Sequence, residues 1–166
     1  MGTRPKKGDP MPSSKPRLLL AAAFTALSAL AANAATVTDC GDDYRASVRN
    51  LAEPWEKNTK SFLNGAVRIA AVDTGGEPVC CSMYLLVLAE GPEDPSGPPE
   101  RICKIIGNAD SLGFMMIDFA NIRSGYNPSR GLDLIMPYKL YIDGLMSRSG
   151  AARINVNLRT GVVSAR

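Results

Sequence analysis

The chain has 166 residues, of which 21% are charged and 6% aromatic, with a formal net charge of +3 at pH 7. It contains no histidine, which excludes Ser-His-Asp and Cys-His nucleophile systems, imidazole metal ligands and an imidazole general base. Five basic residues and one acidic residue lie before residue 35, so the rest of the chain has 14 basic and 15 acidic residues. This near-neutral remainder has no charge footprint for nucleic acid or anionic membranes, and we expect neither as a partner.

An apolar segment near the N-terminus has the pattern of a secretory signal peptide. Residues 18–32 carry no charge, Lys15 and Arg17 precede them, and Ala32-Asn33-Ala34 has the small residues of an A-x-A cleavage site. A membrane-spanning helix needs roughly 20 apolar residues, which is more than this segment offers. We therefore predict cleavage of residues 1–34, with a buried N-terminal helix and a retained signal anchor as the alternatives.

Cleavage at this site defines the expected compartment and domain. Sec-type export would place residues 35–166 in the periplasm or outside the cell, with no stable membrane span. Met11 is an alternative translation start, because residues 1–10 add only polar sequence before a complete signal. A chain of about 130 residues suits a single domain with its own core.

Four cysteines remain after cleavage: Cys40, Cys80, Cys81 and Cys103. An even number in a small exported domain predicts two disulfides. Neighbouring side chains of a strand point to opposite faces, so we expect Cys40 and Cys103 each to pair with one of the tandem cysteines. Pairing of Cys80 with Cys81 is the alternative and would leave Cys40 with Cys103. Without histidine or a C-x-x-C pair, we expect no zinc site and no cofactor.

The first expected element after the signal is a helix over residues 39–60. Acidic residues near its start favour a helix N-terminus. Tyr44, Val48 and Leu51 follow at spacings of four and three, which gives an apolar stripe. Pro54 would end or kink the helix.

Beyond residue 65 the apolar period changes from helical to two. Residues 66–71 alternate, and residues 82–89 are apolar on both faces, as in a covered central strand. Residues 91–100 contain four prolines and three acids and predict an exposed loop. Two further strands are expected over residues 101–106 and 113–122.

The last long strands predict a hairpin with a defined parity. Residues 153–159 alternate between apolar and polar, and the preceding strand has an apolar face formed by Leu132, Leu134, Met136, Tyr138, Leu140 and Ile142. Residues opposite one another in a hairpin share a face, so their numbers must sum to an even value. Tyr138 opposite Val156 and Lys139 opposite Asn155 would satisfy this rule.

Together these elements predict an α+β fold: an N-terminal helix packed on an antiparallel meander sheet of five to seven strands. Residues 154–165 (INVNLRTGVVSA) resemble the terminal hairpin of PepSY-type exported domains, where a short alternating strand runs into a Thr-Gly turn. This resemblance covers twelve residues and implies a hairpin, with no function attached.

Carboxylates are the acids and bases left for catalysis in a chain without histidine. The sequence places no two of them together across a cleft, and we assign no catalytic residue. The candidates are Glu53, Glu56, Asp110, Asp118 and Asp133. A small hydrolase that uses paired carboxylates is therefore an alternative function rather than the leading one.

The same parity defines a candidate interaction face opposite the apolar face of residues 132–142. It is more apolar than solvation alone requires and contains Phe114, Met116, Asp118, Tyr141 and Arg153. We therefore expect a non-enzymatic exported protein, either a binding protein or an envelope accessory factor, whose partner is a protein or a small molecule. A structural subunit of an envelope complex is a further alternative.

Overall fold

The structure is a computed structural model that describes residues 1–3, 35–75, 80–109, 112–144 and 146–166. The chain divides into two units, Met1–Leu30 and Ala31–Arg166. Nearly all of the predicted signal peptide, and the candidate acid Asp110, lie outside the described residues. Every described strand and helix belongs to the second unit.

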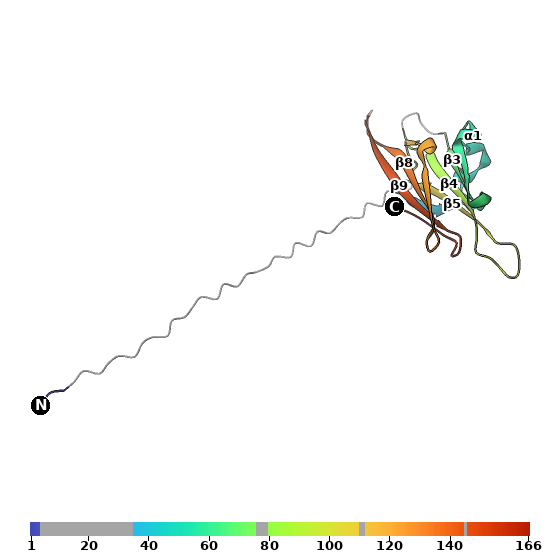
Figure 1. The fold of residues 1–166 in the computed structure, drawn as a ribbon. Helices are drawn as coiled ribbons and strands as arrows, with labels where there is room; N and C mark the ends of the chain where they lie inside the picture. Colours follow the sequence, from blue (N-terminus) through green and yellow to red (C-terminus); the bar gives the residue numbers. More distant parts are fainter. Residues whose placement is uncertain (4–34, 76–79, 110–111, 145) are drawn as a thin grey trace. The chain divides into compact units, whose positions relative to one another are not determined.

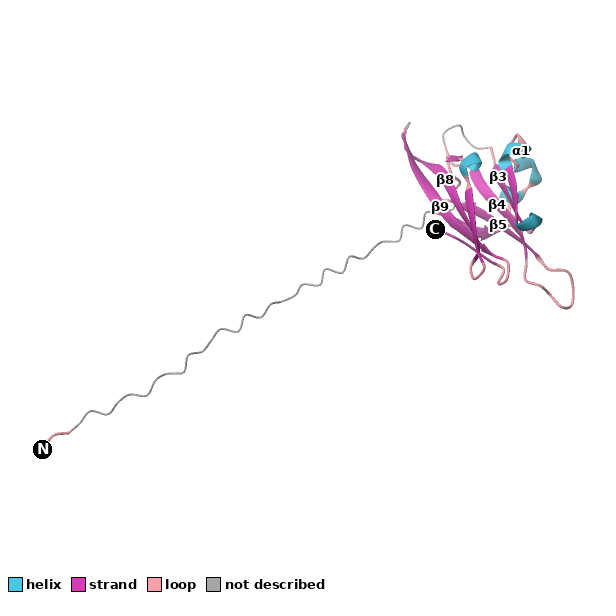
Figure 2. Ribbon diagram, viewed as in Figure 1, coloured by secondary structure: helices cyan, strands magenta, loops and turns pink. Residues whose placement is uncertain are grey.

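The described part of this unit is built mainly from strands, which form two antiparallel sheets (Figures 1 and 2). The first sheet has the order β1-β5-β4-β3-β2. Four of its strands follow one another along the chain as a meander, and β1 joins beside β5. Its strands are β1 (Thr36–Asp39), β2 (Thr59–Phe62), β3 (Val67–Asp73), β4 (Met83–Glu90) and β5 (Arg101–Gly107).

The second sheet has the order β10-β9-β8-β6, and β7 also pairs with β8. Its two long strands, β8 and β9, form a hairpin, and the shorter strands flank this hairpin. The strands are β6 (Met116–Ile117), β7 (Arg123–Asn127), β8 (Gly131–Asp143), β9 (Met146–Asn157) and β10 (Val162–Ala165).

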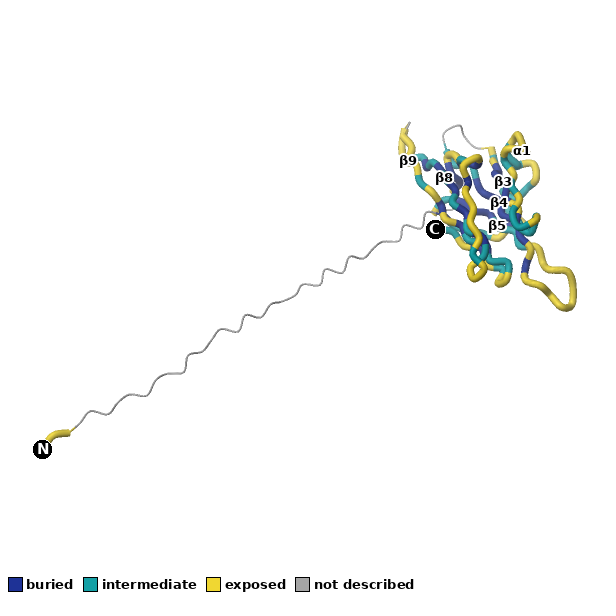
Figure 3. Tube along the Cα trace, viewed as in Figure 1, coloured by how far each residue is buried: buried dark blue, intermediate teal, exposed yellow. Residues whose placement is uncertain are grey.

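The main hydrophobic core lies between the two sheets (Figure 3). Strands β3, β4 and β5 supply side chains from one layer, among them Val67, Leu85 and Ile106, and the second sheet supplies its apolar face. Leu134 and Ile154 belong to that face and are almost fully buried. Each fully buried aliphatic side chain contributes about 1.5–3 kcal/mol, so this interface drives the packing of the two sheets.

The predicted parity of the β8–β9 hairpin is confirmed. Leu132 pairs with Val156 and Leu134 with Ile154, so opposite residue numbers sum to an even value up to an irregularity near Tyr141. The two example pairs were wrong by six residues, since Tyr138 lies opposite Gly150. The hairpin is longer than expected because its turn lies near Gly144.

Pro137 lies in the middle of β8, opposite Ala151 of β9. Its carbonyl oxygen accepts a hydrogen bond from the Asp118 N–H, so its polar backbone edge is turned away from β9. The N–H that proline lacks is therefore not needed in the β8–β9 ladder.

The predicted helix over residues 39–60 was wrong. The segment contains two short 3₁₀ turns, Tyr44–Ala46 and Val48–Asn50, which are separated by Ser47 in an extended conformation. Tyr44 and Val48 of the expected apolar stripe are 70% and 79% exposed. The helix does not form because contacts with the first sheet hold this segment at Cys40 and at Leu51.

One of these contacts is the Cys40–Cys103 disulfide, and the other is a β-bridge between Leu51 and Val72. Among the described residues, the α-helix α1 (Trp55–Asn58) is four residues long. In the part of the chain that the structure describes, no N-terminal helix packs on a sheet, and the predicted α+β class is therefore corrected to a two-sheet β fold.

Several strand predictions are confirmed and one is not. Strand β4 is the central strand of the first sheet and is buried on both faces, as its continuous apolar sequence predicted. The expected strand over residues 113–122 is broken: Phe114 forms an isolated bridge with Met83, β6 has two residues, and Phe119–Asn121 is a 3₁₀ turn. Strands β1, β2 and β7 were not predicted.

The prediction of two disulfides agrees with the structure, but the favoured pairing was wrong. Cys40 pairs with Cys103 across a Cα separation of 5.4 Å, and Cys80 pairs with Cys81. The argument for two separate partners assumed that the tandem cysteines lie on a strand. They instead precede β4, and Cys81 has a left-handed backbone with φ of 72°.

Candidate functional site

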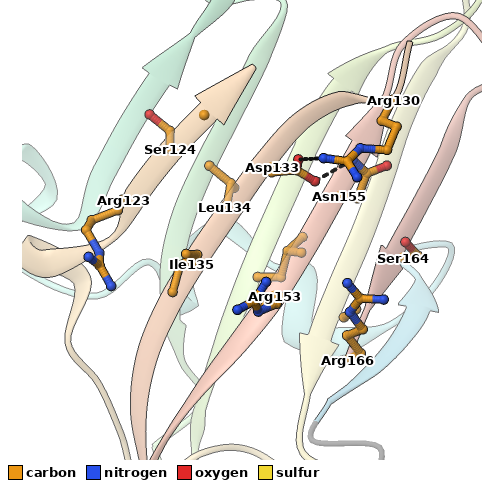
Figure 4. A pocket seen from close by; sticks show the side chains of 13 residues that line it. Arg123, Ser124, Arg130, Asp133, Leu134, Ile135, Arg153, Asn155, Ser164 and Arg166 are labelled. Atoms are coloured by element: carbon orange, nitrogen blue, oxygen red, sulfur yellow. Dashed lines mark hydrogen bonds and ion pairs between the residues drawn. The ribbon is translucent and has the colours of Figure 1, made fainter. Parts of the chain in front are cut away.

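An open groove of about 720 Å³ lies on the outer face of the second sheet. Four strands, β7 to β10, contribute to it (Figure 4). It is lined by Arg123, Ser124, Gly125, Arg130, Asp133, Leu134, Ile135, Arg153, Ile154, Asn155, Ser164, Ala165 and Arg166. Four of these thirteen residues are arginines, which makes the groove strongly basic on a chain that is otherwise near neutral.

Three of the arginines lie in one row across the sheet. The strand register places Arg123 opposite Ile135, Ile135 opposite Arg153, and Arg153 opposite Arg166. Since adjacent strands are about 4.8 Å apart, the row spans about 14 Å. We call Arg123, Arg153 and Arg166 the arginine row. Ile135 is half-buried and lies between Arg123 and Arg153 as an apolar floor.

The charges of the arginine row are not balanced within the groove. Arg123, Arg153 and Arg166 are exposed, and none makes a side-chain hydrogen bond or ion pair with another described residue. Like charges directly opposite one another on a sheet destabilise it, and Arg153 faces Arg166 in this way. Such an arrangement is stabilised when an anion binds, because guanidinium groups form charge-assisted hydrogen bonds with carboxylates and phosphates.

A second row lies beside the first and contains the one acidic side chain of the groove lining. Asp133 accepts a hydrogen bond from Asn155 Nδ2 at 2.8 Å and forms an ion pair with Arg130 at 3.3 Å (Figure 4). These partners hold Asp133 away from the arginine row. Gly125 lies opposite Asp133 and has no neighbouring atom within 4 Å of the position a Cβ would take, so this end of the groove stays open.

Of the five residues in the predicted interaction face, Arg153 is the one that lines the groove. Met116 lies opposite Lys139, and Tyr141 lies opposite Ser147, so both are on the same outer face at rows farther along β8. Met116 is 41% exposed and Tyr141 is half-buried. The structure therefore spreads these residues along the face and does not gather them into one site.

Phe114 was assigned to the wrong face. It is fully buried in the core, where its ring lies 4.8 Å from that of Tyr138. The alternation used in the prediction fails here because the backbone around Phe114 forms an isolated bridge rather than a regular strand. Asp118 is half-buried, and its carboxylate accepts hydrogen bonds from Asn121 Nδ2 at 2.8 and 3.0 Å, which makes it part of a local turn.

The candidate catalytic acids are not brought together in the groove. Glu53 and Glu56 are exposed on either side of Pro54, and Asp118 belongs to the turn after β6. Asp133 lines the groove, where it is bonded to Arg130 and Asn155. The groove lining thus holds no pair of acidic side chains for general acid and base catalysis.

The sequence prediction missed Arg123, Arg130 and Arg166. The confirmed parity rule places Arg153 and Ile135 on the same face, but it could not show that they are neighbours, because the example register was wrong by six residues. Arg123 could not be placed on this face from the sequence, because the residues of β7 show no recognisable alternation. The near-neutral charge of residues 35–166 gave no sign of a local basic cluster, because these arginines are distant in the sequence and meet only across the sheet.

The outer face of the first sheet carries a second group of charged residues. Arg45 donates hydrogen bonds from Nε to both carboxylate oxygens of Asp43 at 2.8 and 2.9 Å, and its guanidinium lies 5.0 Å from the centre of the Tyr84 ring. The side-chain hydrogen bonds from Arg45 lower the pKa of Asp43 below its usual value of 3.8, against the opposing effect of burial. This group is internally satisfied and closes part of the surface over a small core.

Within the described ranges, no three His, Cys, Asp or Glu side chains are grouped so as to hold a metal ion. The described helices are all too short or too polar to cross a bilayer. Comparison of the chain with protein-family models, curated proteins and solved structures finds no match.

Proposed function

We propose that the chain is a non-enzymatic exported binding protein that holds a ligand with several anionic groups in the groove on its second sheet. The observation that carries this proposal is the arginine row. Arg153 and Arg166 are opposite one another, Arg123 lies in line with them, and all three are exposed without a partner among the described residues. An anionic ligand would supply the missing countercharge.

The span of the arginine row indicates the size of this ligand. A single carboxylate or phosphate can bridge the neighbouring Arg153 and Arg166, but Arg123 lies two strands beyond Arg153. With about 4.8 Å between strands, contact with all three favours an extended ligand of about 14 Å that carries anionic groups along its length. The open shape of the groove suits such a ligand, since the groove extends over strands β7 to β10.

The groove favours acidic chains over nucleic acid. Proteins that bind single strands combine positive charge with aromatic side chains on which the bases stack. No aromatic residue is found among the lining residues. Bidentate hydrogen bonds from arginine to carboxylate or phosphate groups are the recognition that the groove offers.

Export is a separate part of the proposal and has its own support. Strand β1 begins at Thr36, directly after the proposed cleavage site, and all four cysteines are disulfide-bonded, as in exported domains. The intact mass of the secreted or periplasmic protein should correspond to a start at Ala35 or within a few residues of it. A mass that retains residues 18–32 would contradict export by a cleaved signal.

Calorimetric titration of the purified protein tests the groove. Hexaglutamate serves as the carboxylate probe and tripolyphosphate as the phosphate probe, with free glutamate as the control. We expect saturable binding of at least one multi-anionic probe, no saturation with glutamate, and weaker binding as salt increases. If neither probe binds at low ionic strength, the proposed function is wrong.

A further inference from the structure

The outer edge of β9 is free over more than half of its length. β9 pairs with β8 along the whole hairpin, but on its other side β10 pairs with residues 154–157 and Arg166 pairs with Arg153. No described residue forms backbone hydrogen bonds with this edge from Met146 to Ala152. These seven residues form the free edge.

The direction of the backbone groups follows from the last paired residue. Arg153 donates its N–H to Arg166 and accepts from the Arg166 N–H, so both groups of Arg153 point away from β8. Since a strand repeats every two residues, Ala151, Ser149 and Ser147 point their N–H and C=O groups the same way. Their three N–H and three C=O groups are available to another strand.

The free edge lacks the features that usually protect an exposed strand. Proteins block such edges with proline, inward-pointing charges, bulges or a covering segment, or they keep the strand short. The segment Met146–Ala152 contains no proline, its single charged residue is Arg148, and its other residues are small apart from Met146. By contrast, β1, β2 and β10 have four residues each.

We propose that a second copy of the chain pairs with this edge in antiparallel fashion, about a twofold axis through Ser149. The register follows from the backbone, because residues with outward groups must face one another. Only a centre at Ser149 uses all three such residues of each copy: Ser149 faces itself, and Ser147 faces Ala151. This pairing forms about six hydrogen bonds, two for each of three residue pairs.

The side chains of the free edge are compatible with this register. Arg148 would face Gly150 of the second copy, so the one charge in the segment has no like charge directly opposite. A twofold axis perpendicular to the sheet leaves both outer faces on the same side. The dimer would therefore present two arginine rows on one continuous surface, although its formation does not depend on ligand binding there.

Sedimentation equilibrium of the purified protein over a range of concentrations tests the proposal, with two substitutions at one position. Ser149→Pro removes the outward N–H and leaves the β8 ladder intact, in the arrangement that Pro137 already has in β8. Ser149→Ala keeps the N–H and is the matched control. We expect a concentration-dependent dimer for the wild type and for Ser149→Ala, and association weakened by at least about tenfold for Ser149→Pro.

A charge exchange tests the register and does not depend on the folding of the proline variant. Ser149→Lys and Ser149→Glu each place like charges opposite one another in the homodimer, and each should weaken it by about two- to fivefold. Mixing the two variants should restore association as a heterodimer. A wild type that stays monomeric up to about 0.5 mM would overturn the proposal, as would a dimer in which the mixture associates no better than either variant alone.

Discussion

Arginine side chains on the outer faces of the two sheets have opposite environments. On the first sheet, Arg45 is bonded to Asp43, two residues away, and lies against the ring of Tyr84. On the second sheet, Arg153 faces Ile135 on one side and another arginine on the other, and has no partner among the described residues. The first arrangement completes a surface, whereas the second leaves charge available to a ligand.

This difference arises from the segments that cover each sheet. The segment between Cys40 and Leu51 crosses the first sheet and is held there by a disulfide and a β-bridge, which places Arg45 over Tyr84. No described segment crosses the second sheet over the arginine row, where the open groove lies. A fold that supplies a countercharge on one face and omits it on the other points to the second face as the place where a partner binds.

The outer face of the first sheet is covered by the segment between Cys40 and Leu51, and the stability of the fold should depend strongly on the Cys40–Cys103 disulfide that holds this segment. Replacing both Cys40 and Cys103 with alanine removes a crosslink between residues 63 apart in the sequence. The loop-entropy relation then predicts a loss of about 4 kcal/mol in the free energy of unfolding. Denaturant titration monitored by far-UV circular dichroism measures this loss.

The tandem disulfide provides the control. The Cys80–Cys81 bond joins adjacent residues and encloses no intervening chain. Replacing both with alanine should change the free energy of unfolding by less than about 1 kcal/mol. Equal losses of unfolding free energy in the two double variants would show that the Cys40–Cys103 disulfide does not hold the covering segment on the first sheet as described.

Arg45 and Arg153 should differ in how much their replacement changes the free energy of unfolding, and this effect is smaller than that of the disulfide. Arg45→Ala breaks charge-assisted hydrogen bonds in a mostly buried pair and should cost about 1–3 kcal/mol of unfolding free energy. Arg153→Ala should change it by less than about 0.5 kcal/mol, or raise it slightly, because a like-charge contact with Arg166 is relieved. Thermal and chemical unfolding of the two variants would contradict the comparison if Arg153→Ala proved the more damaging.

Acid should have a smaller effect on stability, through protonation of Asp43. The pKa of Asp43 is lowered in the folded state by its bonds to Arg45, so its ionised form contributes stability above the unfolded pKa of about 4, and this contribution is lost as the pH falls through the folded pKa. The stability gap between the wild type and Asp43→Asn should therefore narrow below about pH 4. A gap that stays constant from pH 6 to pH 2.5 would exclude this linkage.

Some of the fold followed from sequence because the pattern admitted one physical solution. The continuous apolar run of β4 could be buried on both faces only as a central strand. The alternation in β8 and β9 determined which face is the core, because a shift by one residue would have buried Arg153. Both features depend on neighbours within one strand or one hairpin.

Other features depend on contacts between distant segments and could not be read locally. Tyr44, Val48 and Leu51 have helical spacing, but the Cys40–Cys103 bond and the Leu51–Val72 bridge override it. The short strands β1 and β2 each have four residues, too few for a recognisable period.

The arginine row is missed for the same reason. Its members come from three different segments and are separated by 30 and 13 residues along the chain. Only the register of β7, β8, β9 and β10 shows that they are neighbours. A count of charges over the whole chain, which is nearly balanced after residue 34, conceals such a local excess.

Binding of hexaglutamate to two charge-matched double variants, measured by calorimetry, tests the central claim most directly. One variant combines Arg153→Gln with Arg166→Gln, and the other combines Arg101→Gln with Arg159→Gln, two arginines that do not line the groove. Each removes two positive charges, so a general effect of net charge would weaken binding equally in both. We predict that the first variant loses affinity by at least about tenfold while the second stays within about twofold of the wild type. Equal losses in the two variants, or no loss in the first, would contradict the assignment of the arginine row as the binding site.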